Sequence, residues 1–177
     1  MTTEPRRAAG RGDLLTLLAV AAVVLVADQL TKLAIIASIP FGGRIAIVGD
    51  LFQLWHVRNT GAAFSLLEGG LWLFVVVTIA ALGMVAYFHR SFIGRSRWLQ
   101  VILGVVLGGT LGNFADRLRQ GYVTDFLSFG FGDTRFPTFN VADSAVVVGI
   151  GLLVIILTFF MPETGGRAGE HRTEAST

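Results

Sequence analysis

Two aspartates lie where apolar segments of the sequence give way to polar ones, and this setting suits hydrolytic chemistry. Asp143 stands at the start of a long apolar stretch, and Asp125 lies shortly upstream, after another such stretch ends. Charged side chains at the edge of a bilayer are costly, so acids retained there usually have a function. Two carboxylates close together cannot both ionise easily, and one keeps its proton near neutral pH. Such a pair could serve as general base and general acid around one water molecule and hydrolyse an amide without metal or nucleophile.

The sequence neighbours of these two acids support a catalytic reading. Neither has a basic residue within a helical turn, and the nearest in sequence are Arg119 and Arg135. Unpaired carboxylates beside apolar segments indicate a raised pKa, which is typical of catalytic acids. The alternative is a pair of solvated loop aspartates with no chemical role. We take Asp125 and Asp143 as the candidate catalytic pair.

Asp28 and Lys32 interrupt the first apolar segment, one helical turn apart. At a spacing of i,i+4 the two side chains can form an ion pair. The lysine could instead extend towards lipid phosphates. A structural ion pair and a contact with substrate are both open at this stage.

A second polar group closes the third apolar segment. Asn113, Asp116 and Arg117 are spaced i, i+3 and i+4, so they share one helix face. We expect Asp116 to pair with an arginine, because an unpaired charge near lipid is costly. The fork of Arg117 is suited to a lipid headgroup or a substrate carbonyl. Gly109 belongs to a set of small residues on this segment that favours close helix packing, and we count it among the residues that support the site.

Two asparagines complete the candidate site. Asn59 precedes a glycine and small residues, so it could form a turn or donate its amide to a bound peptide. Asn140 stands three residues before Asp143, where it could face the site or cap the following helix.

Composition places the chain among membrane proteins and excludes several classes of site. It has 177 residues, 53% of them hydrophobic and 15% charged, with a mean hydropathy of +0.69. The net charge is only +2 and the basic residues are scattered, which argues against nucleic-acid binding. The chain has no cysteine and its three histidines show no ligand spacing, so we expect neither a metal site nor a cofactor.

Four apolar segments are long enough to cross a bilayer, which takes about 20 residues. They cover residues 14–36, 71–88, 98–114 and 142–161. The pattern predicts an all-α membrane protein with a single domain over residues 1–177, in which the first segment is a retained signal-anchor helix. The polar stretch 162–177 is expected to be a disordered tail.

The arginines predict how the chain is oriented. Eight flank one set of segment ends and four flank the opposite set, which places both termini in the cytoplasm. Residues 37–70 and 120–140 then lie on the outer face. Within the loop 37–70, two runs rich in β-branched and aromatic residues, 44–48 and 51–57, are separated by Gly49 and Asp50. This pattern predicts a hairpin in a small extracytoplasmic sheet on the membrane surface.

Five short motifs, in order along residues 28–143, resemble the lipoprotein signal peptidase family, signal peptidase II. They read Asp28-Gln-x-x-Lys32, Asn59-x-Gly-Ala-Ala-Phe-Ser65, Gly112-Asn-x-x-Asp-Arg117, Val123-x-Asp-Phe126 and Phe139-Asn-x-Ala-Asp143. Each motif alone is weak, but five in order within a four-span protein are highly specific.

The resemblance implies an aspartic endopeptidase of the bacterial cytoplasmic membrane that cleaves prolipoproteins just before a diacylglyceryl-modified cysteine. It implies that Asp125 and Asp143 form the catalytic dyad. It also implies that other polar residues shape or support the site, namely Asp28, Lys32, Asn59, Asn113, Asp116, Arg117 and Asn140. The family carries an extracytoplasmic β-cradle and is inhibited by cyclic peptides such as globomycin. We expect lipidated prolipoproteins and membrane lipids as partners, and a monomer.

Two other classes of protein fit the sequence less well than a peptidase. A small transporter or channel subunit would place polar residues near the midplane of the membrane, whereas here they gather towards one face. A structural scaffold would need no unpaired acids at all.

Overall fold

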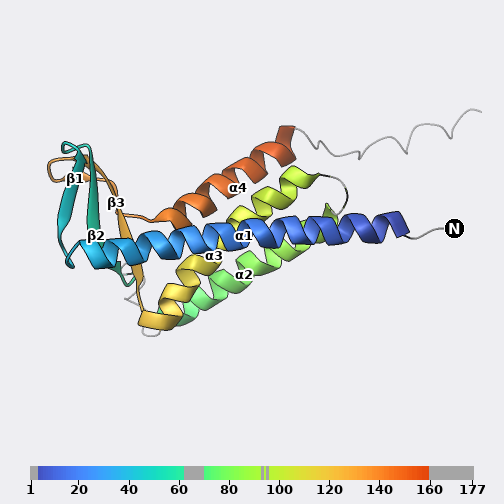
Figure 1. The fold of residues 1–177 in the computed structure, drawn as a ribbon, viewed down its shortest axis with the longest axis horizontal. Coiled ribbons are helices and arrows are strands. Elements are labelled where there is room, and N and C mark those ends of the chain that lie inside the picture. Colours follow the sequence, from blue (N-terminus) through green and yellow to red (C-terminus); the bar gives the residue numbers. More distant parts are fainter. Residues whose placement is uncertain (1–3, 62–69, 93, 95, 160–177) are drawn as a thin grey trace, which may run out of the picture.

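The computed structural model describes residues 4–61, 70–92, 94 and 96–159, and within these ranges the chain forms helices and one small sheet (Figure 1). The elements in order are α1 (Glu4–Ser38), β1 (Arg44–Val48), β2 (Phe52–Asn59), α2 (Gly70–Ser91), α3 (Arg97–Gln120), β3 (Val123–Phe131), β4 (Thr134–Arg135) and α4 (Val141–Phe159). The predicted tail at 162–177 lies outside the described residues.

Each of the four helices contains a stretch long and apolar enough to cross a membrane. Their outward side chains are largely apolar and exposed, as on Leu30, Ile79 and Val147, which suits lipid as the surrounding solvent. With the small antiparallel sheet, this architecture confirms the predicted fold class.

Helix α3 is the centre of the bundle, and it packs against each of the other helices. Glycines make these close approaches possible. A Cβ atom on Gly108 would lie 2.6 Å from the carbonyl oxygen of Ala21 in α1, and one on Gly109 would lie 2.5 Å from that of Ala142 in α4. Gly109 therefore supports the site by letting α4 lie against α3, as the small-residue pattern predicted.

Helices α1 and α3 extend furthest beyond the predicted segments. Helix α1 begins at Glu4 rather than near residue 14, and α3 continues to Gln120 rather than ending at 114. The apolar pattern of α3 ends early because its last turns bury polar side chains against α1. The helix stops at Gly121, whose φ of 78° gives a left-handed cap that bonds back to the carbonyl of Arg117.

The sheet is antiparallel throughout, with strand order β1-β2-β3-β4. Strands β1 and β2 form the predicted hairpin, and Gly49 takes a left-handed φ of 49° in its turn. The sequence pattern predicted no strand at β3, although β3 pairs with β2 and carries Asp125. Its first four residues, 123–126, are all buried, so the alternation that marks a half-buried strand is missing.

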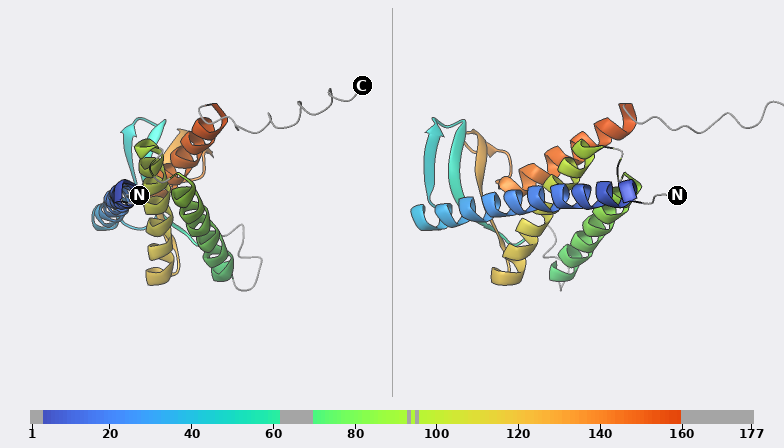
Figure 2. Two further views of the ribbon diagram at one scale, coloured as in Figure 1. Left: turned by 90° about the vertical axis from the view of Figure 1, so that its right-hand side faces the viewer. Right: turned by 45° about the vertical axis from the view of Figure 1, so that its right-hand side comes forward.

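The sheet lies at one end of the helices, opposite the N-terminus of α1 (Figures 1 and 2). A small apolar cluster joins the two parts: Ile35 and Ile39 from the end of α1 pack with Phe126 of β3. This contact fixes β3 beside the ends of α1 and α3 and the start of α4, where the candidate site residues gather.

Candidate active site

Strand β3 holds Asp125 in a buried position between two asparagines. Asn59, at the end of β2, donates its side-chain amide to Asp125 Oδ2 at 2.8 Å. Asn140 donates to the other oxygen, Oδ1, at 2.7 Å. Only 1% of the Asp125 surface is exposed, and this desolvation raises the pKa of Asp125 to about 6 despite the two amide donors. The negative charge of Asp143 raises it further.

Asp143 stands in the first turn of α4 and is held by that turn. Its Oδ2 accepts the backbone N–H of Asn140 at 3.2 Å, while its own N–H donates to Asn140 Oδ1 at 2.9 Å. This reciprocal pair is a capping box, so Asn140 is the predicted N-cap. The remaining oxygen of Asp143, Oδ1, accepts the side-chain amide of Asn113 at 2.6 Å.

Asn140 therefore links the two candidate catalytic acids. Its amide oxygen serves the capping box with Asp143, and its amide nitrogen donates to Asp125 and, at 3.1 Å, to Asn113 Oδ1. Asn140 fills both roles that the sequence left open, since one side chain starts the helix and holds the carboxylate of a neighbouring strand. The fold brings Asp125 and Asp143 together on either side of this asparagine.

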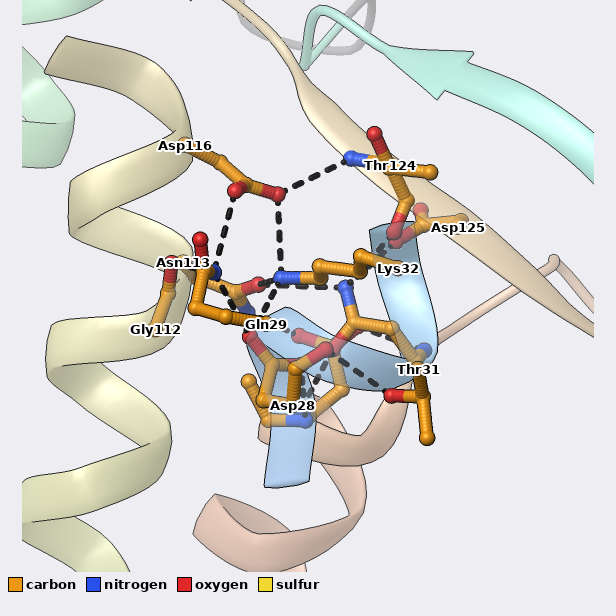
Figure 3. Close-up of polar contacts among 12 residues, drawn as sticks. Asp28, Gln29, Thr31, Lys32, Gly112, Asn113, Asp116, Thr124 and Asp125 are labelled. Atoms are coloured by element: carbon orange, nitrogen blue, oxygen red, sulfur yellow. Dashed lines mark hydrogen bonds and ion pairs between the residues drawn. The ribbon is translucent and has the colours of Figure 1, made fainter. Parts of the chain in front are cut away.

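Beside Asp125 lies a buried ionic cluster centred on Lys32 (Figure 3). Its ammonium contacts Asp28 at 2.8 Å, Asp116 at 3.0 Å and the amide oxygen of Asn113 at 3.0 Å. The ion pair predicted between Asp28 and Lys32 is confirmed. Lys32 does not extend to lipid phosphates, as the sequence also allowed, because only 1% of it is exposed and two carboxylates hold it inside the bundle.

The two acids of this cluster also accept backbone N–H groups from other elements. Asp28 accepts the N–H of Ala142 in the first turn of α4 at 3.0 Å, and Asp116 accepts that of Thr124 in β3 at 3.2 Å. Asp28 thus fixes the turn that carries Asp143, and Asp116 fixes the residue before Asp125. One cluster positions both candidate catalytic acids.

The expectation that the two candidate acids lack cationic neighbours is wrong. Lys32 and Arg117 interact electrostatically with Asp143, and Lys32 also with Asp125. Sequence distance hides this, because the cations come from α1 and α3 while the acids come from β3 and α4. The arginine near Asp116 is Arg119, at 3.6 Å, but the main partner of Asp116 is Lys32.

Arg117 lies beside the site, in the last turn of α3. Its guanidinium stacks over the ring of Phe74 at 3.8 Å and donates to the carbonyl of Asn113 at 3.4 Å. Asn59 accepts the N–H of Gly61, which confirms the predicted local turn, and its side-chain amide donates to Asp125. Donation to a bound peptide stays a prediction. Residues 62–65 of this motif lie outside the described residues.

Gln29 is a member of the site that the sequence reasoning missed. Its side-chain amide donates to Asp28 at 3.1 Å, to Asp116 at 3.1 Å and to the carbonyl of Gly112 at 3.3 Å. A polar amide inside an apolar segment, directly beside Asp28, was the available signal. Among the described residues no group of three or more His, Cys, Asp or Glu side chains could hold a metal ion. The chemistry available in this part of the chain is therefore that of two carboxylates held by amides.

Comparison with known proteins bears directly on this site. The family model for signal peptidase (SPase) II matches residues 20–160, a range that includes all of the residues above. The chain is similar to the lipoprotein signal peptidase of Shouchella clausii strain KSM-K16, with 44% identity over 136 residues, covering 77% of this chain and 88% of that one. It is also similar to the lipoprotein signal peptidase of Rhodococcus jostii strain RHA1, with 41% identity over 161 residues, or 88% and 78% of the two chains.

Solved structures show the same fold. A bacterial membrane enzyme determined by the in meso method at 1.9 Å resolution superposes with a TM-score of 0.71 at 33% sequence identity. The match covers 80% of this chain and 92% of that one. A second such structure, at 2.3 Å resolution, gives a TM-score of 0.69 at 32% identity, over 86% and 94% of the two chains.

Proposed function

The chain belongs to the signal peptidase II family, whose members remove signal peptides from prolipoproteins, and from that premise we propose that Asp125 and Asp143 carry out this hydrolysis. The observation that carries the proposal is the shared asparagine. Asn140 contacts both acids, one in a strand and one at a helix start, and so holds the two close together in one buried site. Two acids in one buried site share protons readily.

The proposed reaction uses one water molecule and both acids. The ionised carboxylate takes a proton from water while the resulting oxygen attacks the scissile carbonyl carbon, and the protonated partner hydrogen-bonds to the carbonyl oxygen. The carbon–nitrogen bond of the tetrahedral intermediate then breaks, and the first acid returns its proton to the leaving amine. The raised pKa of Asp125, at about 6, supports a shared proton near neutral pH.

The surrounding residues hold the acids rather than exchange protons. Asn59, Asn113 and Asn140 each donate an amide N–H to a carboxylate oxygen, which fixes the orientation of both acids. Lys32 and Arg117 add positive charge near Asp143 and limit the cost of burying an ionised pair. Arg117, whose guanidinium stacks on Phe74 of α2, is the residue we assign to substrate contact or local support.

The substrate we propose is a prolipoprotein whose cysteine already carries diacylglyceryl, cut just before that cysteine. The exposed apolar faces of the helices suit acyl chains and a signal peptide that enter sideways from the bilayer. The arginine bias supports cytoplasmic termini and a site near the outer face of a bacterial membrane. Cyclic peptides such as globomycin are proposed inhibitors, and a monomer is the proposed active form.

A cleavage assay on a diacylglyceryl-modified precursor peptide tests the assignment. Asp125→Asn and Asp143→Asn should each lower kcat by about 100-fold to 10,000-fold, because asparagine keeps the shape but cannot exchange the proton. The double variant should be hardly worse than either single, since the two acids act as one unit. Asp13→Asn is the matched control. It changes a buried aspartate at the opposite end of α1, whose carboxylate accepts the N–H of Gly94 far from the two acids.

If folded Asp125→Asn protein retained more than about a tenth of the wild-type kcat, this dyad would be excluded. Such a loss in kcat is much smaller than the loss expected when a proton-transfer group is removed.

A further inference from the structure

An open cavity of about 640 Å³ lies against Asp125 on the side of the sheet. It is lined by the face of the sheet that carries Trp55, Val57 and Asn59, and by the chain after β4 from Phe136 to Thr138. Its volume is within the range of ligand pockets, about 300–1,000 Å³. The strands that line it belong to the sheet, which lies beyond the ends of the helices (Figure 1).

The substrate segments before and after the scissile bond differ in polarity, and this difference decides which of them fits the cavity. The signal peptide before the cut is apolar and belongs among the membrane-spanning helices. The mature chain after the cut is the part that remains outside the bilayer. If the bond lies at Asp125 and Asp143, the mature chain has to leave along the sheet, and this inference rests on the proposed function above.

Two arginines of the cavity wall stack on aromatic rings. The guanidinium of Arg44 stacks on Trp55, which also lines the cavity, at 3.7 Å. The side chain of Arg58 points to the opposite face of β2 from Val57 and Asn59, where its guanidinium lies over Phe41 at 4.7 Å and Tyr122 at 4.9 Å. Within the described part of the chain, neither guanidinium has a hydrogen bond or an ion pair with a carboxylate. Stacking uses the flat face of the guanidinium and leaves its N–H groups at the edge available for an acceptor.

The third arginine of the cavity is already occupied. Arg135 pairs with Asp50 at 3.1 Å and donates to Ser128 at 2.8 Å, so it serves the sheet itself. Asp133 is exposed at the cavity rim and contributes one negative charge. The unpaired positive charge of the cavity therefore belongs to Arg44.

We propose that this cavity binds the first residues of the mature lipoprotein and that Arg44 selects for acidic side chains among them. From Asn59, which touches Asp125, to Trp55 is four residues of strand, or about 13 Å. An extended peptide covers that length with about four residues. The acids that matter should therefore lie within roughly four residues after the lipidated cysteine.

The experiment compares three lipidated precursor peptides that are identical through the cysteine. Residues two to four after it are aspartate-rich in the first, asparagine-rich in the second and lysine-rich in the third. Wild-type protein should show a kcat/KM for the acidic peptide about two- to fivefold above the neutral one, with the basic peptide lowest. The preference should shrink at high ionic strength because the pocket is open to solvent.

Arg44→Gln should bring the ratio of acidic to neutral kcat/KM towards one, whereas Arg44→Lys should keep part of it. Arg90→Gln is the matched control, since it removes an exposed arginine from the far end of α2 and should leave the ratio unchanged. Equal cleavage of the three peptides by wild type would overturn the inference, as would a preference that survives in Arg44→Gln. Activity that depends on anionic lipid but not on peptide charge would overturn it too, by assigning Arg44 to lipid phosphates.

Cleavage of the neutral peptide keeps the two proposals apart. If wild type cuts it but shows no charge preference, the peptidase proposal stands and this inference falls. If wild type cuts none of the lipidated peptides, the proposed function is wrong and the inference falls with it.

Discussion

Replacing Lys32 with methionine removes the central charge of the buried cluster while keeping a side chain of similar length. In the wild type the ammonium lies 2.8 Å from Asp28 and 3.0 Å from Asp116, and both carboxylates are 0% exposed. Lys32→Met leaves these two negative charges buried without the cation. We therefore expect a large loss of stability, in addition to any effect on cleavage.

The magnitude follows from the burial. Breaking a buried pair by removing one partner costs about 3–5 kcal/mol, because the remaining charge is left without compensation. For a chain of this size each kcal/mol shifts Tm by roughly 2–4 °C, so the expected fall in apparent Tm is about 6–20 °C. Arg119 provides the contrast: it faces the same Asp116 at 3.6 Å, but its side chain is 53% exposed. An exposed pair contributes no more than about 1 kcal/mol, so Arg119→Gln should lower Tm by a few degrees at most.

The assay is thermal unfolding of the purified protein in one detergent at one scan rate, for wild type, Lys32→Met, Arg119→Gln and the double variant Lys32→Met/Asp116→Asn. The double variant removes one of the two uncompensated charges, and the amide oxygen of the new side chain can still accept the N–H of Thr124. It should recover a measurable part of the lost Tm. A Lys32→Met variant no less stable than Arg119→Gln, or a double variant less stable than Lys32→Met alone, would refute the reasoning.

Three further predictions concern pH, packing and orientation. Burial raises the pKa of Asp125 from 3.8 to about 6, so this group favours the folded state below pH 4 and loses that contribution as the pH rises through 6. The Tm of Asp125→Asn minus the Tm of wild type should therefore increase between pH 4 and 6.5 and then level off. A Tm difference that does not change with pH would contradict the raised pKa. Gly112→Ala would place a Cβ 2.5 Å from Asp28 Oδ2 and should cost about 1–3 kcal/mol of unfolding free energy, whereas Gly83→Ala meets nothing within 4 Å and should be neutral or stabilising in the same unfolding measurement. A reporter fused after Thr177 should be active in the cytoplasm and one inserted near Gly69 should be active outside, and the reverse pattern would exclude an outward-facing site.

Local patterns in the sequence predicted the helices, the hairpin and the membership of most of the site. Apolar length marks the spans, and the Gly49-Asp50 turn marks the hairpin, since both depend on residues adjacent in the chain. The Asp28–Lys32 pair was predictable for the same reason, because i,i+4 residues meet on any helix. The asparagine cap at Asn140 is likewise a local signal.

Strand β3 and the long-range partners of the ionic cluster were not predictable in this way. Buried on both faces at its start, β3 shows no alternation, and its pairing with β2 joins residues about 66 positions apart, as in the bond between Asn59 and Asp125. Lys32 and Asp116 are 84 residues apart in the sequence, so their ion pair leaves no local signal. The sequence suggested an arginine as the partner of Asp116, whereas its main partner is this lysine from another helix. Contacts between residues of different elements depend on how the helices pack against one another, and this packing cannot be predicted from the sequence of one segment alone.

The capping box at the start of α4 bears on how resistance to an active-site inhibitor could arise. The bonds that orient Asp143 are the same bonds that begin the helix, and Ala142, one residue earlier, is bonded to Asp28. A substitution that weakened an inhibitor's contact with either acid would therefore also unwind the first turn of a membrane-spanning helix. We expect escape mutations to accumulate instead on the cavity wall around Trp55 and Phe136, where a side chain can change without loosening the fold.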